Sequence, residues 1–553
     1  MKLNLYDQIK NLTTEMVAIP SINKEPKGES NVAQYVYEYY AKLDYFKENP
    51  HQFKKFQTKN DFVERHSTYA YVKGTKGTSN KTIILIGHID TVGVDDYGTI
   101  KEYAFNTEEL PAKLMETFVL PEEVIEDIKS GEYMFGRGAL DMKAGVAVHM
   151  SLIKYFSEHR DEIDGNIIAI AECDEEDNSK GIITALDELV ELKEKEGFEY
   201  ISCINADYST NYSPGDENRY IYHGSIGKLL PGFVALGKEA HVGQAFTALD
   251  PNLLIAEITR NMSLNVDLCD VANGEVAIPP ISLKQADTKV GYTVQTALVA
   301  YSYYNFFTHG KNPQEVLDLC KGIAVKSFDK VVEYLNEQYD KFCKLSKIDT
   351  VKLPWQTRVY TWSEFYKEIA KEHGSKYTDY IHTYIEELHK NDPELDLRIF
   401  SLKVIEESWK FMTDKSPAVV LFFGSIFNAR IEMTGRTDKE KALLTAVDVA
   451  IEKVKGEAKR EIKTRMFYPY ISDSSFMAVC DDLLSIQAVG DNMPAWGPKY
   501  THDVDKIMEI DVPVVNIGTF GRDGHMVTER VDMYHTFQNV PNITYETIVD
   551  LLK

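Results

Sequence analysis

Residues 82–92 read TIILIGHIDTV, and this stretch decides the fold class. Its first six residues are a continuous β-branched and aliphatic run, which is typical of a strand buried on both faces of a parallel sheet. Two runs of the same kind follow at 165–172 (GNIIAIAE) and 200–206 (YISCINA), with helical periodicity between the runs. Strands that alternate with helices predict an α/β fold with its active site at the carboxyl ends of the strands.

The same pattern returns near the C-terminus, but the middle of the chain differs. Between 226 and 462, strand-like segments stand beside long, charged helical segments with few Gly or Pro. We therefore expect a discontinuous catalytic domain at 1–225 and 463–553, with a mixed, mostly parallel sheet flanked by helices. Residues 226–462 would form an inserted α+β lid domain, enlarged by a helical insertion at about 310–415.

Composition excludes several classes of protein. The 553 residues include 61 Lys and Arg against 86 Asp and Glu, a net charge of −25 that disfavours binding to nucleic acid. The chain shows neither an apolar stretch of about 18 residues nor an apolar signal segment at its start, so we expect no membrane span and no secretion. Six scattered cysteines without a CxxC pair fit free thiols in a reducing cytosol, so we expect a cytoplasmic protein.

Polar residues follow the predicted strands at positions where chemistry is usually placed. His88 and Asp90 come directly after the first strand. Because they are two positions apart, both side chains point to the same side of an extended backbone. Asp141 lies in GRGALDMKAG (136–145), a glycine-rich turn that leads into a helix. Each feature alone also has a structural explanation, as a strand-end histidine with a capping aspartate or as a helix N-cap.

Three more signals complete the set. An acidic run that contains Glu175 and Glu176 follows the second strand, Asp207 follows the third, and His525 lies in a glycine-rich segment after the C-terminal strand. An acidic run is usually a solvated loop, but the apolar strand that leads into this one argues against that interpretation. Two histidines and three carboxylates without a thiolate are the ligand set of a paired hydrolytic metal centre with zinc, manganese or cobalt. One glutamate of the 175/176 pair remains for proton transfer.

The ordered motifs GHIDTV, GRGALDMKAG, DEE (174–176) and GRDGHMVTE (521–529) resemble one family of enzymes. This is the dinuclear zinc aminoacylase, carboxypeptidase and deacylase family, which includes glutamate carboxypeptidase and succinyl-diaminopimelate desuccinylase. AIPS (18–21) is similar to its N-terminal signature. Segments such as HGSIGK (223–228) and GKEAHVG (237–243) further resemble its arginine-utilisation branch of the RocB type. The resemblance implies a zinc-exopeptidase-like catalytic domain with a lid.

Position by position, the resemblance implies a role for each candidate residue. His88 and Asp207 would bind one metal ion, Glu176 and His525 would bind the other, and Asp141 would bridge the two. Catalytic roles would fall to Glu175 as general base, Asp90 as the partner of His88, and His241 as the lid histidine that supports the developing oxyanion. Arg430 and Asp473 are the candidates for substrate contacts.

The sequence therefore predicts a hydrolase with two divalent ions, zinc first and cobalt or manganese as alternatives. Its substrate would be a small N-acyl amino acid or short peptide with an amide bond to cleave, in arginine or amino-acid catabolism. A homodimer through the lid domain is the expected assembly. Two other readings remain open: a catalytically silent binding or regulatory protein that keeps the fold, and a dinuclear phosphoesterase, which would need cationic groups near a phosphate.

Overall fold

The structure of the chain, a computed structural model, describes residues 3–553 and divides into two compact units. Unit 1 comprises Met1–Ser225, Ile431–Val479 and Asp503–Lys553, and unit 2 comprises Ile226–Arg430 and Cys480–His502. Residues 431–462 therefore pack with unit 1 and residues 480–502 with unit 2, whereas the sequence analysis assigns both segments the other way. No helix in the described part of the chain is both long enough and apolar enough to cross a membrane.

Unit 1 is built on a nine-stranded sheet with the order β1-β2-β5-β3-β6-β18-β7-β16, and β17 pairs with β7. The four neighbours β5, β3, β6 and β18 are mutually parallel, and antiparallel strands flank them. The strands of this sheet are β1 (Phe53–Gln57), β2 (His66–Lys73), β3 (Lys81–His88), β5 (Asn166–Glu172), β6 (Glu199–Asn205), β7 (Arg219–Ser225), β16 (Ile431–Glu432), β17 (Ile462–Arg465) and β18 (Val514–Asn516). The mixed α/β sheet predicted from the sequence is confirmed, and its parallel part is the central group of four strands.

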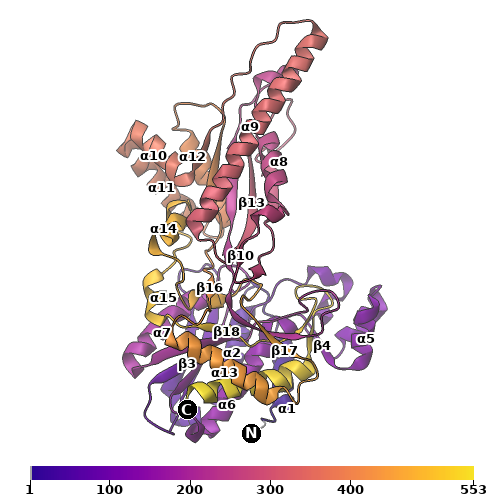
Figure 1. The fold of residues 1–553 in the computed structure, drawn as a ribbon, viewed down its shortest axis with the longest axis vertical. Coiled ribbons are helices and arrows are strands. Elements are labelled where there is room, and N and C mark those ends of the chain that lie inside the picture. The colour runs from indigo at the N-terminus through magenta and orange to yellow at the C-terminus, as the bar shows by residue number, and fades with distance from the viewer. Residues whose placement is uncertain (1–2) are drawn as a thin grey trace. The chain divides into compact units, whose positions relative to one another are not determined.

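The helices of unit 1 lie around its sheet, except that α5 stands away from it and contacts β4 of a small second sheet (Figure 1). They are α1 (Tyr6–Val17), α2 (Gly28–Ala41), α3 (Asp44–Glu48), α4 (Leu110–Thr117), α5 (Glu122–Ser130), α6 (Ala144–Glu158), α7 (Lys180–Glu196), α13 (Asp438–Val454), α15 (Val504–Ile510) and α16 (Val540–Leu551). A small sheet contains β4 (Tyr133–Phe135), β19 (Gly521–Arg522) and β20 (Arg530–Asp532). Packing of α13 against α16, the yellow helix at the C-terminus, explains why residues 431–462 belong to this unit.

The core of unit 1 lies around the central parallel strands. Ile83, Ile84, Leu85 and Ile86 of β3 are completely buried, because α-helices cover both faces of the strand. Helix α6 is buried nearly all round between Ala144 and Phe156, as expected for a helix inside a large domain. This apolar frame fixes the carboxyl ends of β5, β3 and β6, where the polar residues of the site begin.

Unit 2 contains a six-stranded sheet with the order β12-β13-β9-β15-β14, and β8 pairs with β13. Its strands are β8 (Gly227–Leu229), β9 (Pro231–Leu236), β12 (Ile281–Asp287), β13 (Val299–Thr308), β14 (Val359–Thr361) and β15 (Ala418–Phe423), and a separate hairpin joins β10 (Val271–Ala272) to β11 (Glu275–Val276). The helices are α8 (Pro251–Met262), α9 (Pro313–Ser346), α10 (Trp362–His373), α11 (Ser375–Asn391), α12 (Leu397–Trp409) and α14 (Leu483–Asp491). Unit 2 is thus the α+β part of the chain.

Candidate metal centre

The site lies where the four parallel strands of unit 1 end. The register places His88, the last residue of β3, beside Glu172, the last residue of β5, while Asn205 of β6 pairs with both Ile86 and Asn516. The segments that follow these strands therefore start from one edge of the sheet. This edge is the usual position for a binding site in a parallel α/β sheet.

Asp141 lies at the centre of the cluster. One of its carboxylate oxygens is 2.9 Å from Nε2 of His88, and the other is 2.9 Å from Nε2 of His525. The Nε2 atom of His525 is also 3.0 Å from a carboxylate oxygen of Glu176. A single buried carboxylate thus joins residues that are separated by more than four hundred positions in the sequence.

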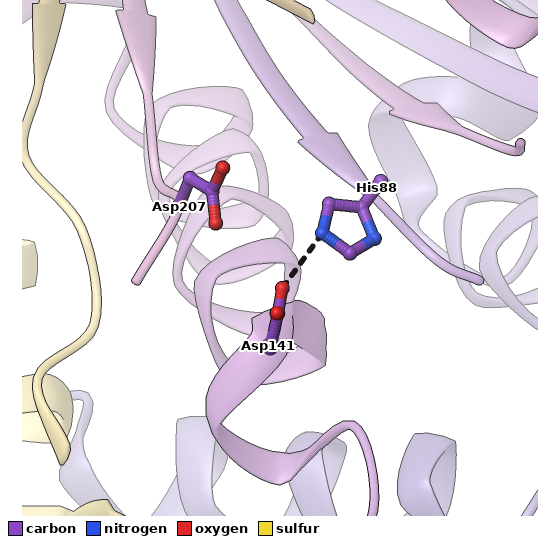
Figure 2. Close-up of side chains that lie close together, drawn as sticks. All are labelled: His88, Asp141 and Asp207. Carbon is purple, nitrogen blue, oxygen red and sulfur yellow. Dashed lines mark hydrogen bonds and ion pairs between the residues drawn. The ribbon is translucent and has the colours of Figure 1, made fainter. Parts of the chain in front are cut away.

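Two sets of three candidate ligands share Asp141. His88, Asp141 and Asp207 form the first set, whose side chains converge in Figure 2, and Asp141, Glu176 and His525 form the second. Within each set, one donor atom of every residue lies within 4.8 Å of the others. Glu175 belongs to a third set with His88 and Glu176. The structure therefore brings together all five residues that the sequence suggests as metal ligands, together with the suggested base.

The orientation of His88 suits metal binding through Nε2. Its Nδ1 atom lies 3.2 Å from the backbone carbonyl oxygen of Asp90 and 3.5 Å from the carboxylate of the same residue. Two acceptors at this nitrogen place a proton on Nδ1, so that Nε2 is the atom that faces the cluster. Asp90 also accepts the backbone N–H groups of Glu175 (3.2 Å) and Glu176 (3.1 Å), a second role that the sequence did not reveal.

The acidic side chains of the cluster repel one another when they are charged. Burial and the charge of Asp141 raise the pKa of Asp207 to about 7. Burial also raises the pKa of Glu175 well above its usual value, with contributions from Asp473 and Asp207, although His88 opposes the shift. Buried carboxylates remain charged at low cost only when positive charge neutralises them.

Acidic neighbours raise the pKa of the histidines as well. Burial alone would lower the pKa of His525, but Asp141 and Glu176 raise it to about 11. Asp141 keeps a pKa below its usual range because His525 and His88 outweigh the effect of its burial. Nitrogen and oxygen donors, a shared carboxylate and a local excess of negative charge all fit two divalent cations.

A buried ion pair holds the turn that carries Asp141. Glu529 accepts the backbone N–H groups of Gly138 (2.8 Å), Leu140 (3.3 Å) and Asp141 (3.4 Å). The guanidinium of Arg137 lies 2.6 Å from Glu529 and also donates to the carbonyl oxygen of His525 (3.3 Å). We call Arg137 and Glu529 the Arg137 clamp. Neither residue received a role from the sequence alone, although each lies inside one of the motifs that predict the site.

Tyr208 supports the loop that carries His525. The backbone carbonyl of Tyr208 accepts the hydroxyl of Tyr468 (2.8 Å), and its ring stacks on Tyr470 with centroids 4.9 Å apart. A Cβ atom at Gly524 would lie 2.9 Å from the Tyr208 ring, so the loop approaches this ring closely only because residue 524 is a glycine. His525 itself has a positive φ of 65°, a conformation that non-glycine residues adopt rarely.

The remaining candidates belong to none of these sets of candidate ligands. Asp473 is 2% exposed in unit 1, and its charge raises the pKa of Glu175. Arg430 belongs to unit 2, where its guanidinium lies 2.9 Å from Asp481. His241 is an exposed residue of unit 2, and its Nδ1 atom accepts the backbone N–H of Gly243 at 3.1 Å.

Comparisons with known proteins support the same assignment. The sequence matches the family described as Peptidase family M20/M25/M40 over residues 84–549. Protein RocB of Bacillus subtilis is 32% identical over 551 residues, which cover 100% of this chain and 96% of the relative. Uncharacterized protein YqjN of the same organism is 31% identical over 562 residues, with 100% and 98% covered. A succinyl-diaminopimelate desuccinylase of Bradyrhizobium sp. is 27% identical over 246 residues, or 44% of this chain and 56% of the relative.

Solved structures share the fold at much lower identity. The M20 family metallo-carboxypeptidase Sso-CP2 of Sulfolobus solfataricus aligns with a TM-score of 0.51 at 13% identity, and 99% of each chain is covered. Aminopeptidase PepT of Bacillus cereus aligns with a TM-score of 0.52 at 11% identity, again with 99% of each chain covered.

Proposed function

Because this chain belongs to the peptidase family M20/M25/M40 and is a metal-dependent amidohydrolase, we propose that it cleaves an amide bond in a small N-acyl amino acid or a short peptide. The family and the RocB-type branch predicted from the sequence are both confirmed. The observation that carries the proposal is the position of Asp141, shared between two sets of candidate ligands, with Glu175 beside them.

In this proposal, His88 and Asp207 hold one cation, Glu176 and His525 hold the other, and Asp141 contacts both. Zinc suits this mixture of imidazole and carboxylate donors, and cobalt and manganese are the alternatives. When bound, the cations would supply a water molecule of lowered pKa and an electrophile for the amide carbonyl oxygen. The side chain of His525 is 45% exposed, which leaves the cluster accessible to a substrate on that side.

Glu175 is the proposed proton carrier. Its carboxylate would accept the proton of the attacking water and return it to the nitrogen of the leaving amine as the C–N bond breaks. One carboxylate oxygen lies 3.9 Å from Nε2 of His88, so the group faces the cluster. Burial raises the pKa of Glu175 above its usual value, which makes its carboxylate a stronger base.

Three residues are proposed as contacts to the substrate: His241, Arg430 and Asp473. Because Nδ1 of His241 accepts a hydrogen bond from Gly243, the neutral ring carries its proton on Nε2 and can donate to a developing oxyanion. Arg430 is the proposed partner of a substrate carboxylate, with Asp481 fixing the plane of its guanidinium. Asp473 is the weaker candidate for a substrate contact, because it is almost completely buried.

We also propose that the protein forms a homodimer and that it is located in the cytoplasm. Strand β12 forms one edge of the unit 2 sheet and exposes Ile281 and Leu283, so we propose that this lid unit joins two copies of the chain. The substitution Leu283→Lys should then shift the mass in light scattering from dimer to monomer, and an unchanged mass would contradict the proposal. No disulfide joins the six cysteines, all of which lie in the described residues, and this is in keeping with the proposed cytoplasmic location.

The decisive experiment for the reaction uses Glu175→Gln, which keeps the shape of the side chain and removes the base. The protein, purified with its metals, is tested for amine release from N-acyl amino acids and dipeptides, with N-acylarginines included because of the RocB-type branch. We expect Glu175→Gln to retain its metals and to lose at least about 10²-fold in turnover, as expected for the loss of a general base.

The matched control is Asp177→Asn, in the same segment. Its carboxylate pairs with Lys24 at 2.8 Å, so turnover should be unchanged. If Glu175→Gln remained active, the assignment of the base would be wrong. If the metal-loaded wild-type protein released no amine from any member of the panel, the proposed substrate class would be wrong.

A further inference from the structure

The N-terminal segment that precedes α2 lies against the strand end that carries His88. The hydroxyl of Ser21 donates to the carbonyl oxygen of Ile89 (2.6 Å), and the backbone N–H of Thr91 donates to the carbonyl oxygen of Ser21 (3.0 Å). The backbone N–H of Asn23 in turn donates to the carbonyl oxygen of Thr91 (2.9 Å). We call residues 20–24 the N-terminal strap. The motif match at its start gives this segment no chemical role.

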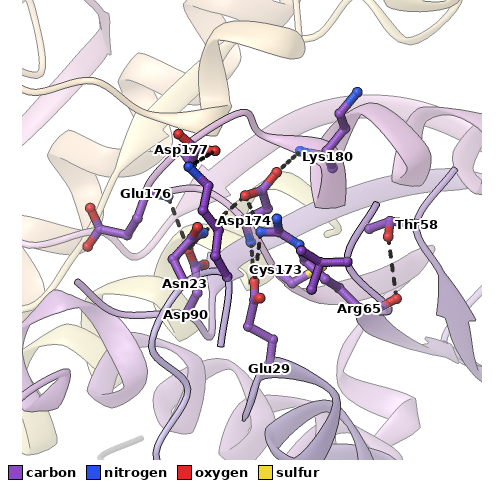
Figure 3. Close-up of polar contacts among 12 residues, drawn as sticks. Asn23, Glu29, Thr58, Arg65, Asp90, Cys173, Asp174, Glu176, Asp177 and Lys180 are labelled. Carbon is purple, nitrogen blue, oxygen red and sulfur yellow. Dashed lines mark hydrogen bonds and ion pairs between the residues drawn. The ribbon is translucent and has the colours of Figure 1, made fainter. Parts of the chain in front are cut away.

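The side chain of Asn23 joins two parts of the site (Figure 3). Its amide nitrogen donates to a carboxylate oxygen of Asp90 at 3.0 Å and to a carboxylate oxygen of Asp174 at 3.0 Å. Asp90 stands behind His88, whereas Asp174 begins the segment that carries Glu175 and Glu176. One side chain therefore fixes the spacing between the end of β3 and the acidic segment after β5.

Buried ion pairs hold Asp174, one of the two residues that Asn23 connects. Arg65 is 1% exposed and forms ion pairs with Asp174, Glu29 (3.5 Å) and Asp61 (3.1 Å). Glu29 also accepts the backbone N–H of Asp174 at 2.9 Å. We call Arg65 with these three acids the Arg65 network. Asp174 has a positive φ of 65°, so its backbone takes a conformation that these surrounding contacts must maintain.

We propose that Asn23 is a positioning residue for the metal centre. By linking Asp90 to Asp174, it keeps the Glu175–Glu176 segment at the distance from His88 that the donor atoms require. The inference rests on the proposed function only in treating these residues as ligands and base. Its physical basis is that the partners behind metal ligands fix their orientation, and that their loss typically lowers metal affinity or activity about 10–100-fold.

The test compares Asn23→Ala with Lys24→Ala. Asn23→Ala removes both donations from the side-chain amide, while the main-chain bond to Thr91 remains. Lys24→Ala removes a half-exposed ion pair with Asp177 from the same strap. Calorimetric titration of each metal-free protein with Co²⁺ measures affinity without any substrate, so failure of this inference is distinguishable from failure of the proposed reaction.

We expect Asn23→Ala to weaken Co²⁺ binding about 10–100-fold, and Lys24→Ala to bind like the wild type. Turnover, once a substrate is known, should fall for Asn23→Ala mainly in kcat and little in KM, because the residue touches no substrate. Asn23→Asp should be worse than Asn23→Ala, since it places a third carboxylate between Asp90 and Asp174. Equal Co²⁺ affinity for Asn23→Ala and Lys24→Ala would overturn the proposal, and so would Co²⁺ binding by Asn23→Asp that equals the wild type.

Discussion

The Arg137 clamp and the Arg65 network are two buried arginine ion-pair systems behind the same site, and they reach it in different ways. In the clamp, Glu529 accepts the backbone N–H of Asp141 itself, and Arg137 donates to the carbonyl oxygen of His525. In the Arg65 network, by contrast, Glu29 accepts the backbone N–H of Asp174, which is not a candidate ligand. The network reaches Asp90, behind His88, through the side chain of Asn23.

The two systems should therefore differ in their effect on the geometry of the site and not in their effect on the stability of the fold. Both arginines are 1% exposed and neutralise buried acids, so each should matter similarly for folding. Only the clamp holds two candidate ligands by their own main-chain atoms. A change in the Arg137 clamp should therefore displace candidate ligands directly. A change in the Arg65 network can displace them only by moving the half-buried side chain of Asn23.

The largest expected effect comes from replacing each arginine by methionine. Arg137→Met and Arg65→Met should each lower the free energy of unfolding by about 3–5 kcal/mol, because each removes the positive charge that neutralises buried carboxylates. Metal affinity should separate them, with a loss of about 100-fold for Arg137→Met and about tenfold for Arg65→Met. Urea unfolding and Co²⁺ titration measure the two quantities.

If a methionine variant does not fold, the lysine variant at the same position is measured in its place. The lysine variants keep the charge and lose the forked geometry of the guanidinium. The same loss of Co²⁺ affinity at both positions would show that the two systems support the site equally and would contradict a more direct role of the Arg137 clamp.

The second expected effect concerns pH, because protons and cations compete for the same carboxylates. Burial and Asp141 raise the pKa of Asp207 to about 7 in the metal-free fold, against about 3.9 in an unfolded chain. The folded state therefore keeps a proton that the unfolded state has lost, and raising the pH from about 5 to about 8 destabilises the metal-free protein. A bound cation replaces that proton.

Stabilisation by metal should accordingly grow with pH, by up to about 1.4 kcal/mol per pH unit for each proton displaced. Thermal unfolding with and without Zn²⁺ at several pH values between about 5 and 8 measures the difference in Tm. A difference that stays constant or shrinks as the pH rises would mean that Zn²⁺ does not displace protons from this cluster.

The smallest expected effect tests the loop of His525. Gly524→Ala would place a Cβ atom 2.9 Å from the Tyr208 ring and should cost about 1–3 kcal/mol, with weaker Co²⁺ binding. The control is Gly322→Ala in α9, where no atom lies within 4 Å and alanine should stabilise the helix by up to about 1 kcal/mol. Thermal unfolding compares the two variants, and unchanged Tm and Co²⁺ affinity in Gly524→Ala would show that the loop can move away from Tyr208.

Much of the fold and the site could be predicted because the decisive residues form local patterns. The apolar strand before His88 and the glycine-rich turn around Asp141 are each continuous in sequence, so a short stretch of residues is enough to recognise them. The boundaries of the inserted segment were harder to predict from the sequence. Whether residues 431–462 pack with unit 1 depends on the contact of α13 with α16, and residues so far apart leave no signal in a local pattern.

By itself, the sequence determined the α/β class, the family and the identity of the polar residues at the strand ends, since strand and turn preferences act over a few residues. Only the tertiary structure decided that Glu529 holds the turn of Asp141 and that Asn23 links Asp90 to Asp174. These contacts join segments from both ends and the middle of the chain. Their geometry follows from the packing of the whole sheet and its helices, and no short stretch of sequence contains that information.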